Sequence, residues 1–367
     1  MSSLLKDLYS PDLYNRLADS FSKTIPSFDK QKFLSFIFTD AFQNMELKER
    51  MRHTSRILHE FLPADYAEAV NLIEKIITGL RKDGFGEQRL EYMFLSDYIE
   101  VYGLNDFDNS IKALEFITQF ISCEFAVRPF ILKYGNKMIS QMEIWSKHTN
   151  YHVRRFASEG SRPRLPWAMA IPDLKKDPTP ILPILENLQN DPSEYVRRSV
   201  ANSLNDIAKD HPQVVIDTAK RWKGSSKETD AIIKHGSRTL LKQGHTDILK
   251  HYGLVSDKVE ITDFQILTPK IQIGESLEFS FLVTNQQNEK QTIRLEYAVY
   301  YQKANAQLAK KVFKISERTF QPQEIILIKR KQSFRLITTR KFYLGAHKLS
   351  IIVNGDEKVT ASFELIN

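Results

Sequence analysis

The feature that most constrains the fold is a motif that occurs twice along the chain. The sequence VRR fills residues 153–155 and returns, at an offset of 43 residues, in 196–198. Residues upstream of both copies also match in character, so the repeat is longer than the motif. A period in the low forties with a helical apolar pattern is typical of HEAT-like repeats. Because one helix pair cannot bury its apolar face alone, the repeat predicts a solenoid of stacked pairs.

The second copy separates into an apolar and a polar face. Its predicted core residues recur at helical spacing and are Val196, Val200, Leu204 and Ile207. The opposite face carries Arg198, Asn202, Asn205, Asp206 and Lys209. We expect this polar face to remain available to a ligand. A weaker third copy over residues 230–243 is predicted to lead to the end of the solenoid near residues 248–253.

A second structural class follows the helices. From about residue 255 the segments alternate apolar and polar residues and are rich in β-branched and aromatic side chains, which is the period of strands. Asn354-Gly355 lies between two such segments and is a strong hairpin signal. We therefore predict a chain that is mainly α-helical. A HEAT-like α-helical solenoid is expected over residues 1–253, and an all-β immunoglobulin-like sandwich without a cystine over residues 254–367.

The charge of the chain favours a polyanionic partner. Its 367 residues carry a net charge of +7, and eight basic residues accompany three acidic ones between residues 124 and 167. Such an excess is typical of proteins that bind nucleic acid or an anionic membrane, although many ordinary proteins are also basic. The β-rich segment adds the run Lys329-Arg330-Lys331. That run either protects an edge strand from pairing or contacts a phosphate backbone.

Several classes of site are absent from the sequence. Cys123 is the single cysteine, which excludes an internal disulfide and a cysteine-rich metal site. Nine histidines are scattered without metal-ligand spacing, and there is no glycine-rich phosphate loop. No apolar stretch has the length of a signal-peptide core or of a membrane-spanning helix. We expect a soluble cytoplasmic monomer without a metal, a cofactor or a membrane partner.

Carboxylates embedded among arginines are the remaining candidates for chemistry, and Glu124, Glu159 and Asp206 stand out. An acidic side chain facing DNA phosphates is electrostatically costly unless a positive group lies nearby. Cleavage of an N-glycosidic bond provides one, because the sugar gains oxocarbenium character that a fixed carboxylate stabilises while it orients water. A base that is already cationic through alkylation leaves without a general acid.

Structural explanations compete with these roles. Asp206 also fits a solvated or arginine-paired position on a helix. Glu124 and Arg128 share a helix face at i, i+4 spacing, which permits a surface ion pair. Trp167 fits a core position, or its ring lies against a sugar or a cationic base, a contact worth about 0.5–2 kcal/mol. The residues alone leave these alternatives open.

Three segments carry a resemblance to a known family. CEFAVRPF at residues 123–130, VRRFASEGSRPRLPWA at 153–168 and VRRSVANSLNDIAKDHP at 196–212 resemble segments of the AlkC branch of the AlkC/AlkD DNA alkylation repair glycosylases. The N-terminal helices and the C-terminal strands are similar to that branch too, so the resemblance covers essentially the whole chain. It implies a bacterial monofunctional DNA glycosylase of base excision repair. Such an enzyme removes cationic N3-methylated bases, 3-methyladenine and 3-methylcytosine, from double-stranded DNA without full base flipping.

The resemblance also assigns residues. It implies catalytic carboxylates at Glu124 and Asp206, a third candidate at Glu159, and contacts to the lesion nucleotide and its backbone from Arg155 and Trp167. Further DNA contacts fall on basic and polar positions of the two motifs, which are Arg154, Arg162, Arg164, Arg197, Arg198 and Asn202. An arginine of a repeat can instead bridge neighbouring repeats by pairing with carbonyls or acids.

Two other classes of function fit the sequence. One is a non-catalytic HEAT-repeat protein that binds or scaffolds DNA, and the other is a HEAT adaptor that binds proteins. The first shares salt-dependent DNA binding with a glycosylase, but it would lose nothing when Asp206 is replaced by Asn. The adaptor would not bind DNA and would tolerate loss of the basic face.

Overall fold

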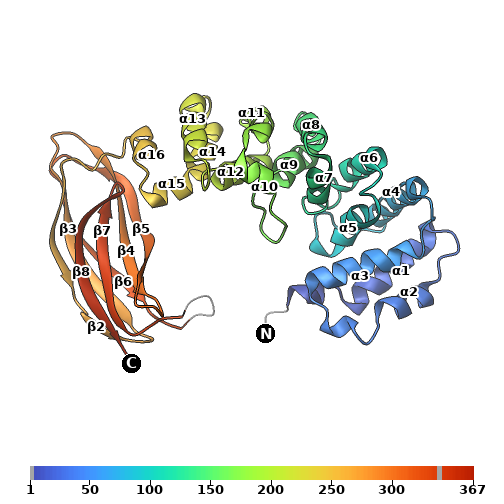
Figure 1. The fold of residues 1–367 in the computed structure, drawn as a ribbon, viewed down its shortest axis with the longest axis horizontal. Helices are drawn as coiled ribbons and strands as arrows, with labels where there is room; N and C mark the ends of the chain where they lie inside the picture. Colours follow the sequence, from blue (N-terminus) through green and yellow to red (C-terminus); the bar gives the residue numbers. More distant parts are fainter. Residues whose placement is uncertain (1–3, 337–340) are drawn as a thin grey trace. The chain divides into compact units, whose positions relative to one another are not determined.

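The computed structural model describes residues 4–336 and 341–367. The chain divides into two compact units after Gly236. Among the described residues the first unit is helical, and the second holds two short helices followed by strands (Figure 1). The predicted order of a helical part and an all-β part is thereby confirmed. The units divide earlier than the change from helix to strand, because the helices α15 (Arg238–Gln243) and α16 (Thr246–His251) group with the strands.

The first unit contains fourteen α-helices in the described part of the chain, several of them begun by side-chain caps. Asp29, Asp65 and Asp106 each accept a hydrogen bond from a backbone N–H of the first turn. In chain order the helices are α1 (Pro11–Thr24), α2 (Lys30–Ile37), α3 (Leu47–His59), α4 (Tyr66–Lys82), α5 (Met93–Tyr102), α6 (Phe107–Ile117), α7 (Val127–Tyr134), α8 (Asn136–Trp145), α9 (Tyr151–Gly160), α10 (Pro172–Lys176), α11 (Leu182–Leu188), α12 (Glu194–Ile207), α13 (Pro212–Trp222) and α14 (Lys227–Gly236).

The repeats form a row of helix pairs. The helices α9, α12 and α14 pack against one another in succession, while α8, α11 and α13 lie on the other side of this layer (Figure 1). The predicted core residues of the second copy are buried, namely Val196, Val200, Leu204 and Ile207. Ser158 and Ser199 share a 2.6 Å hydrogen bond between their hydroxyl groups. Their small side chains let α9 and α12 approach closely, and these two helices carry much of the predicted site.

Tryptophans join neighbouring helix pairs on the other side of the row. The indole N–H of Trp145 on α8 donates to Glu115 of α6 at 2.6 Å. The indole N–H of Trp222 on α13 donates to Glu186 of α11 at 2.7 Å. Hydrogen bonds to a charged acceptor are worth more than neutral ones. These two indole hydrogen bonds help to fix the register of successive helix pairs, and the geometry of the site depends on that register.

The second unit is a sandwich of two sheets in the part of the chain described. Its strands are β1 (Val259–Ile266), β2 (Lys270–Gln272), β3 (Ser276–Asn285), β4 (Gln291–Gln302), β5 (Leu308–Phe320), β6 (Ile325–Ser333), β7 (Gly345–Val353) and β8 (Asp356–Ile366). One sheet has the order β1-β3-β6, and the other β2-β8-β7-β4-β5. All pairings are antiparallel except β2 with β8. Apolar residues from both sheets form one core.

Two sequence signals in this unit have clear structural outcomes. Asn354 and Gly355 have φ angles of 46° and 88° and form the two-residue turn between β7 and β8, so the predicted hairpin is confirmed. The run Lys329-Arg330-Lys331 lies on β6, which is at the edge of the three-stranded sheet. Charged residues on an edge strand oppose pairing with another chain.

None of the helices in the described residues has the length and the apolar character needed to cross a membrane.

Candidate active site

Glu124 lies on the loop that precedes α7. A Cβ atom on Gly160, the last residue of α9, would lie 2.7 Å from Val127 Cγ1, so the absence of a side chain lets α9 approach α7. Glu124 also forms an ion pair with Arg155 of α9. Ser122 hydrogen-bonds both of these side chains. The loop and α9 are thereby held together by charge.

A continuous chain of ion pairs joins the three predicted carboxylates. Arg155 Nη2 lies 3.7 Å from Glu159 Oε1, and the same oxygen accepts a hydrogen bond from Arg162 Nη1 at 2.5 Å. Arg162 Nη2 lies 2.8 Å from Asp206 Oδ2, and Lys209 Nζ lies 3.0 Å from Asp206 Oδ1. The structure therefore brings the three predicted carboxylates together, alternating with cations, from three different elements of the fold.

The charges in this chain balance, and the arginines remain protonated. Burial disfavours the charge on Arg155, but attraction to Glu124 and Glu159 outweighs it and raises the pKa of Arg155. Burial likewise opposes the charge on Arg162, while Glu159 and Asp206 raise the pKa of Arg162. Two fixed guanidinium groups therefore orient the carboxylates, and little rearrangement is needed when a positive charge develops beside them.

Asp206 differs from its predicted setting. We expected it on an open polar face of α12, but its side chain is only 3% exposed and pairs with Arg162, on the loop after α9, as in the arginine-paired alternative. The neighbouring Asn205 is buried as well, so only part of the predicted polar face is open. Glu159 is 7% exposed and Glu124 is 17% exposed. Of the three carboxylates, Glu124 is therefore the one most accessible from solution.

The predicted surface pair between Glu124 and Arg128 is wrong. Arg128 is fully buried and donates to the carbonyl oxygens of Met169, Gly160 and Arg162 at 2.5, 3.0 and 2.9 Å. Burial and the nearby Arg162 lower the pKa of Arg128 to about 10, which still leaves it charged at neutral pH. Arg128 thus anchors the loop of residues 161–171 to α7.

Trp167 lies on that loop and is 60% exposed, which excludes a core position. Its φ angle of 64° is in the left-handed region, which costs a residue with a side chain about 1–2 kcal/mol. Lys48 of α3 donates a hydrogen bond to the Trp167 carbonyl oxygen. The other two tryptophans, Trp145 and Trp222, are buried. The indole ring of Trp167 is therefore available for contact with a ligand.

Two of the predicted DNA-binding arginines are used inside the protein. Arg154 forms an ion pair with Asp191 at 2.6 Å, across the junction between neighbouring repeats. Arg197 donates to the carbonyl oxygen of Asp191 at 2.7 Å. Arg154 therefore matches the alternative in which an arginine of the motif bridges repeats, whereas Arg197 bonds the turn that precedes its own helix α12.

The remaining basic and polar candidates lie closer to the surface. Arg164 pairs with both carboxylate oxygens of Asp210, each at 2.6 Å. Arg198 is 72% exposed and pairs with Glu194 at 2.7 Å. Asn202 is partly buried on α12 and hydrogen-bonds a histidine of α14. Arg198 is thus the most accessible of the predicted arginines.

Aromatic residues beside the ion-pair chain were missed by sequence reasoning. The guanidinium carbon of Arg155 lies 4.7 Å from the ring centroid of Tyr195. Tyr151 lies 6.5 Å from Tyr195, and both rings are partly exposed. Burial lowers the pKa of His152, which keeps this neighbouring imidazole neutral at pH 7. A tyrosine lies within two residues before VRR in each copy, Tyr151 in the first and Tyr195 in the second, and this was the signal that could have identified them.

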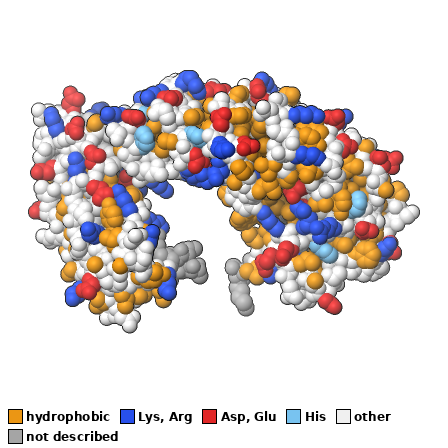
Figure 2. Space-filling model, in the orientation of Figure 1, with side chains coloured by type: hydrophobic (Ala, Val, Ile, Leu, Met, Phe, Trp, Pro, Cys, Tyr) orange, Lys and Arg blue, Asp and Glu red, His pale blue; other side chains and the backbone are white. Residues whose placement is uncertain are grey.

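The surface around the site is mixed in charge. In Figure 2, basic side chains (blue) gather over the middle of the helical unit, where Figure 1 draws α9, α10 and α12, with acidic side chains (red) beside them. Within residues 4–336 and 341–367, no group of His, Cys, Asp or Glu side chains is arranged to hold a metal ion. The side chains described at the site are carboxylates, arginines and aromatic rings.

A helical-repeat unit with buried carboxylates held by arginines, followed by an immunoglobulin-like unit, defines the class of the protein. Residues 114–232 match the family model described as DNA alkylation repair enzyme. Residues 260–367 match the C-terminal Ig-like domain of the uncharacterised protein YhaZ. All three carboxylates of the site lie within the first of these segments.

Two known proteins are similar to the chain over essentially its whole length. Uncharacterized protein YhaZ of Bacillus subtilis (strain 168) is 45% identical over 362 residues, which are 98% of this chain and 99% of that protein. The solved structure of Pseudomonas fluorescens alkylpurine DNA glycosylase AlkC, bound to DNA containing an abasic site analog, is 34% identical with a TM-score of 0.91 and full coverage of both chains. The chain belongs to the AlkC-like branch of the DNA alkylation repair enzyme family, as its sequence motifs predicted.

Proposed function

We propose that the chain is a monofunctional DNA glycosylase that hydrolyses the N-glycosidic bond of cationic alkylated bases in double-stranded DNA. The expected substrates are 3-methyladenine and 3-methylcytosine, and the protein is expected to act as a monomer in the cytoplasm without a cofactor. The observation that carries this proposal is the clustering of Glu124, Glu159 and Asp206 on one chain of ion pairs. The similarity to a solved alkylpurine DNA glycosylase supports it.

The cluster suits the charge that develops when such a bond breaks. The sugar becomes oxocarbenium-like, and a preorganised carboxylate stabilises that charge more strongly in the transition state than in the ground state. A cationic base leaves as a neutral molecule, so no protonated group is needed to assist it. The neighbouring His152, whose pKa is lowered by burial, is a poor acid at neutral pH. The site therefore favours bases whose bond to the sugar is already weakened by charge.

The exposed fractions of the three carboxylates suggest a different role for each. Glu124 is the most accessible of the three, so we assign it to the sugar cation. Asp206 is buried but forms an ion pair with Lys209, whose side chain is 41% exposed. We assign to this pair the role of orienting the attacking water. Glu159 lies between Arg155 and Arg162 and holds both guanidinium groups in place. Full extrusion of the base into a closed pocket is not required by this arrangement.

The test is release of methylated bases from methylated duplex DNA by the wild type, Glu124→Gln and Asp206→Asn. Both variants are expected to lose about 100-fold to 1,000-fold in release rate, the usual cost of removing one preorganised group that stabilises transition-state charge. Asp217→Asn is the control, because Asp217 is 58% exposed on α13, where it lies 3.9 Å from Lys220 and accepts a hydrogen bond from Gln213 at 2.8 Å. DNA affinity, measured in parallel, should persist in all variants.

Two outcomes would contradict the proposal. Release by Glu124→Gln and Asp206→Asn at the wild-type rate would remove these carboxylates from the chemistry. Absence of release by the wild type, with salt-dependent binding to duplex DNA intact, would instead assign the chain to non-catalytic DNA-binding proteins of the same fold.

A further inference from the structure

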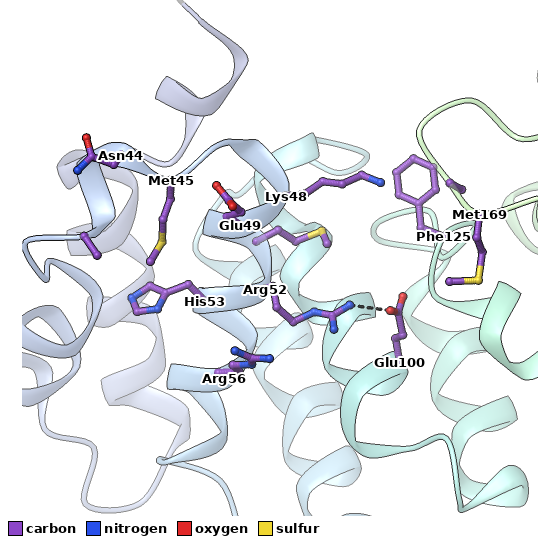
Figure 3. Close-up of a pocket in the computed structure, with 13 residues that line it drawn as sticks. Asn44, Met45, Lys48, Glu49, Arg52, His53, Arg56, Glu100, Phe125 and Met169 are labelled. Carbon is purple, nitrogen blue, oxygen red and sulfur yellow. Dashed lines mark hydrogen bonds and ion pairs between the residues drawn. The ribbon is translucent and has the colours of Figure 1, made fainter.

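A cavity of about 640 Å³ lies in the first unit, next to the predicted site but outside the ion-pair chain. One wall is α3, and Figure 3 shows Lys48, Arg52 and Arg56 following one another along this helix. The opposite wall carries Phe125 and Met169. The cavity therefore carries three basic side chains on the α3 wall and two large apolar ones opposite, and Glu49 and Glu100 also line it.

The charges of this wall are only partly used within the protein. Arg52 is committed, since it pairs with Asp97 at 2.8 Å and with Glu100 at 2.6 Å. Arg56 is exposed, and within the described residues neither a hydrogen bond nor an ion pair joins it to another side chain. Lys48 is also exposed and donates to a backbone carbonyl, so its charge is not neutralised by an acid.

One acidic residue of the same helix leaves the positive charge of this wall in place. Glu49 accepts a hydrogen bond from the backbone N–H of Glu46 at 2.7 Å and so closes the first turn of α3. Its carboxylate lies at the positive end of the helix dipole, where a negative charge is stabilised. The cavity wall thus keeps two basic groups for an anionic ligand, Lys48 and Arg56.

The opposite wall ties the cavity to the predicted site. Phe125 directly follows Glu124 in the chain, and Met169 follows Trp167 by two residues. Lys48 Nζ lies 5.1 Å from the ring centroid of Phe125 and also donates to the carbonyl oxygen of Trp167. A ligand in the cavity would therefore lie within a few residues of both groups that are expected to contact the damaged nucleotide.

We propose that this cavity binds the phosphodiester backbone of DNA beside the lesion, with Arg56 and Lys48 each contacting a phosphate. The two residues are eight positions apart on α3, a distance of about 12 Å along the axis. A DNA strand advances about 3.4 Å along the duplex axis per nucleotide, so this distance corresponds to three to four nucleotides of axial rise. An extended anion with regularly spaced charges fits the two positions better than a small ion does, since a small ion reaches only one of them.

This inference deepens the proposed function and rests on it only for the position of the lesion. The DNA alkylation repair segment begins at residue 114, so α3 lies outside it and the match assigns no role to this helix. Binding of DNA to α3 would add an N-terminal contact on the far side of the carboxylates. The damaged nucleotide would then be held between α3 and the repeat helices.

Salt dependence of DNA binding tests the proposal. Affinity for a duplex that contains an abasic-site analogue is measured at several salt concentrations for the wild type, Arg56→Gln and Lys48→Gln. Each lost phosphate contact should reduce the slope of log K against log salt by about 0.9. Lys112→Gln is the control, because Lys112 is exposed on α6 and does not line the cavity. This variant should keep the wild-type slope.

Replacing single phosphates with uncharged methylphosphonates then locates the contact. Wild type should lose affinity when a phosphate within about four nucleotides of the lesion is neutralised, and Arg56→Gln should be insensitive to that same replacement. Unchanged slopes in both cavity variants, or equal sensitivity of Arg56→Gln and wild type at every phosphate, would overturn the proposal. Base release by the wild type is measured on the same preparation. Its absence would contradict the glycosylase assignment while leaving the phosphate contact supported by the slopes.

Discussion

Arg162→Met is expected to be the most destabilising single change in the ion-pair chain. Arg162 lies between Glu159 and Asp206, whose side chains are 7% and 3% exposed, so its loss leaves two buried carboxylates partly uncompensated. Removal of one partner from a buried pair costs about 3–5 kcal/mol. Arg155 and Lys209 still contact these carboxylates, so we place the loss in free energy of unfolding at about 3 kcal/mol.

Thermal unfolding followed by far-UV circular dichroism measures this loss. For a unit of about 236 residues, each kcal/mol lowers Tm by about 2–4 °C, so the expected fall is about 6–12 °C. Arg198→Met is the matched control, since Arg198 is 72% exposed and pairs with Glu194 one turn away. Such a pair contributes about 0.3–0.5 kcal/mol, which predicts a fall below about 2 °C. Equal falls in the two variants would refute the reasoning.

Trp167→Leu is expected to shift the free energy of unfolding by less than about 0.5 kcal/mol because the ring is exposed. It should nevertheless slow base release and abolish any change of tryptophan fluorescence on DNA binding; an unchanged release rate would argue against a lesion contact. Arg154→Met should be destabilised, since Asp191 is 3% exposed, but its affinity for duplex DNA at a temperature where it is folded should equal that of the wild type. Weaker binding by the folded variant would show that Arg154 contacts phosphates. Burial raises the pKa of Glu357, but the hydrogen bond and charge of Lys310 and other hydrogen bonds outweigh it and lower that pKa below 4.5. A lowered pKa adds stability above the unfolded-state value that is lost as pH falls through the folded-state value. Glu357→Gln should therefore be less stable than wild type at about pH 7, and this gap should narrow as pH falls below 4.5. A gap that stays the same size as pH falls would contradict this linkage.

The architecture could be predicted because its signals are local and repeated. The VRR motif at residues 153–155 and 196–198 marks the second helix of two successive pairs, and α9 and α12 lie side by side as that repeat requires. Asn354-Gly355 specifies its own backbone conformation, so the hairpin between β7 and β8 followed from two residues. Neither inference needed knowledge of distant neighbours.

The partners of the arginines could not be predicted in the same way. Arg155 and Arg198 occupy equivalent positions of the two motifs, yet Arg155 is 12% exposed and Arg198 is 72% exposed. The difference arises because the loop before α7 places Glu124 against Arg155, whereas Arg198 pairs with Glu194 of its own helix. A motif records which residues are present, but burial depends on which other element covers them.

Contacts over long sequence separations account for the remaining differences. Arg128 was expected at the surface, but the loop of residues 161–171 turns back and surrounds it with carbonyl oxygens. Lys48 reaches a residue that is 119 positions away in the chain. The helical pattern of α3 gave no indication that its basic side chains lie beside the predicted site, because the pattern describes one helix at a time.

The most direct test of the central claim compares two duplexes in single-turnover base release, one with a cationic 3-methyladenine and one with a neutral damaged base such as hypoxanthine. Carboxylates that stabilise the sugar cation without a general acid should release the cationic base and leave the neutral base in place. Glu124→Gln should in addition lose the release of 3-methyladenine. Release of both bases at comparable rates would show that the site contains an acid, and would contradict the mechanism derived from the Glu124, Glu159 and Asp206 cluster.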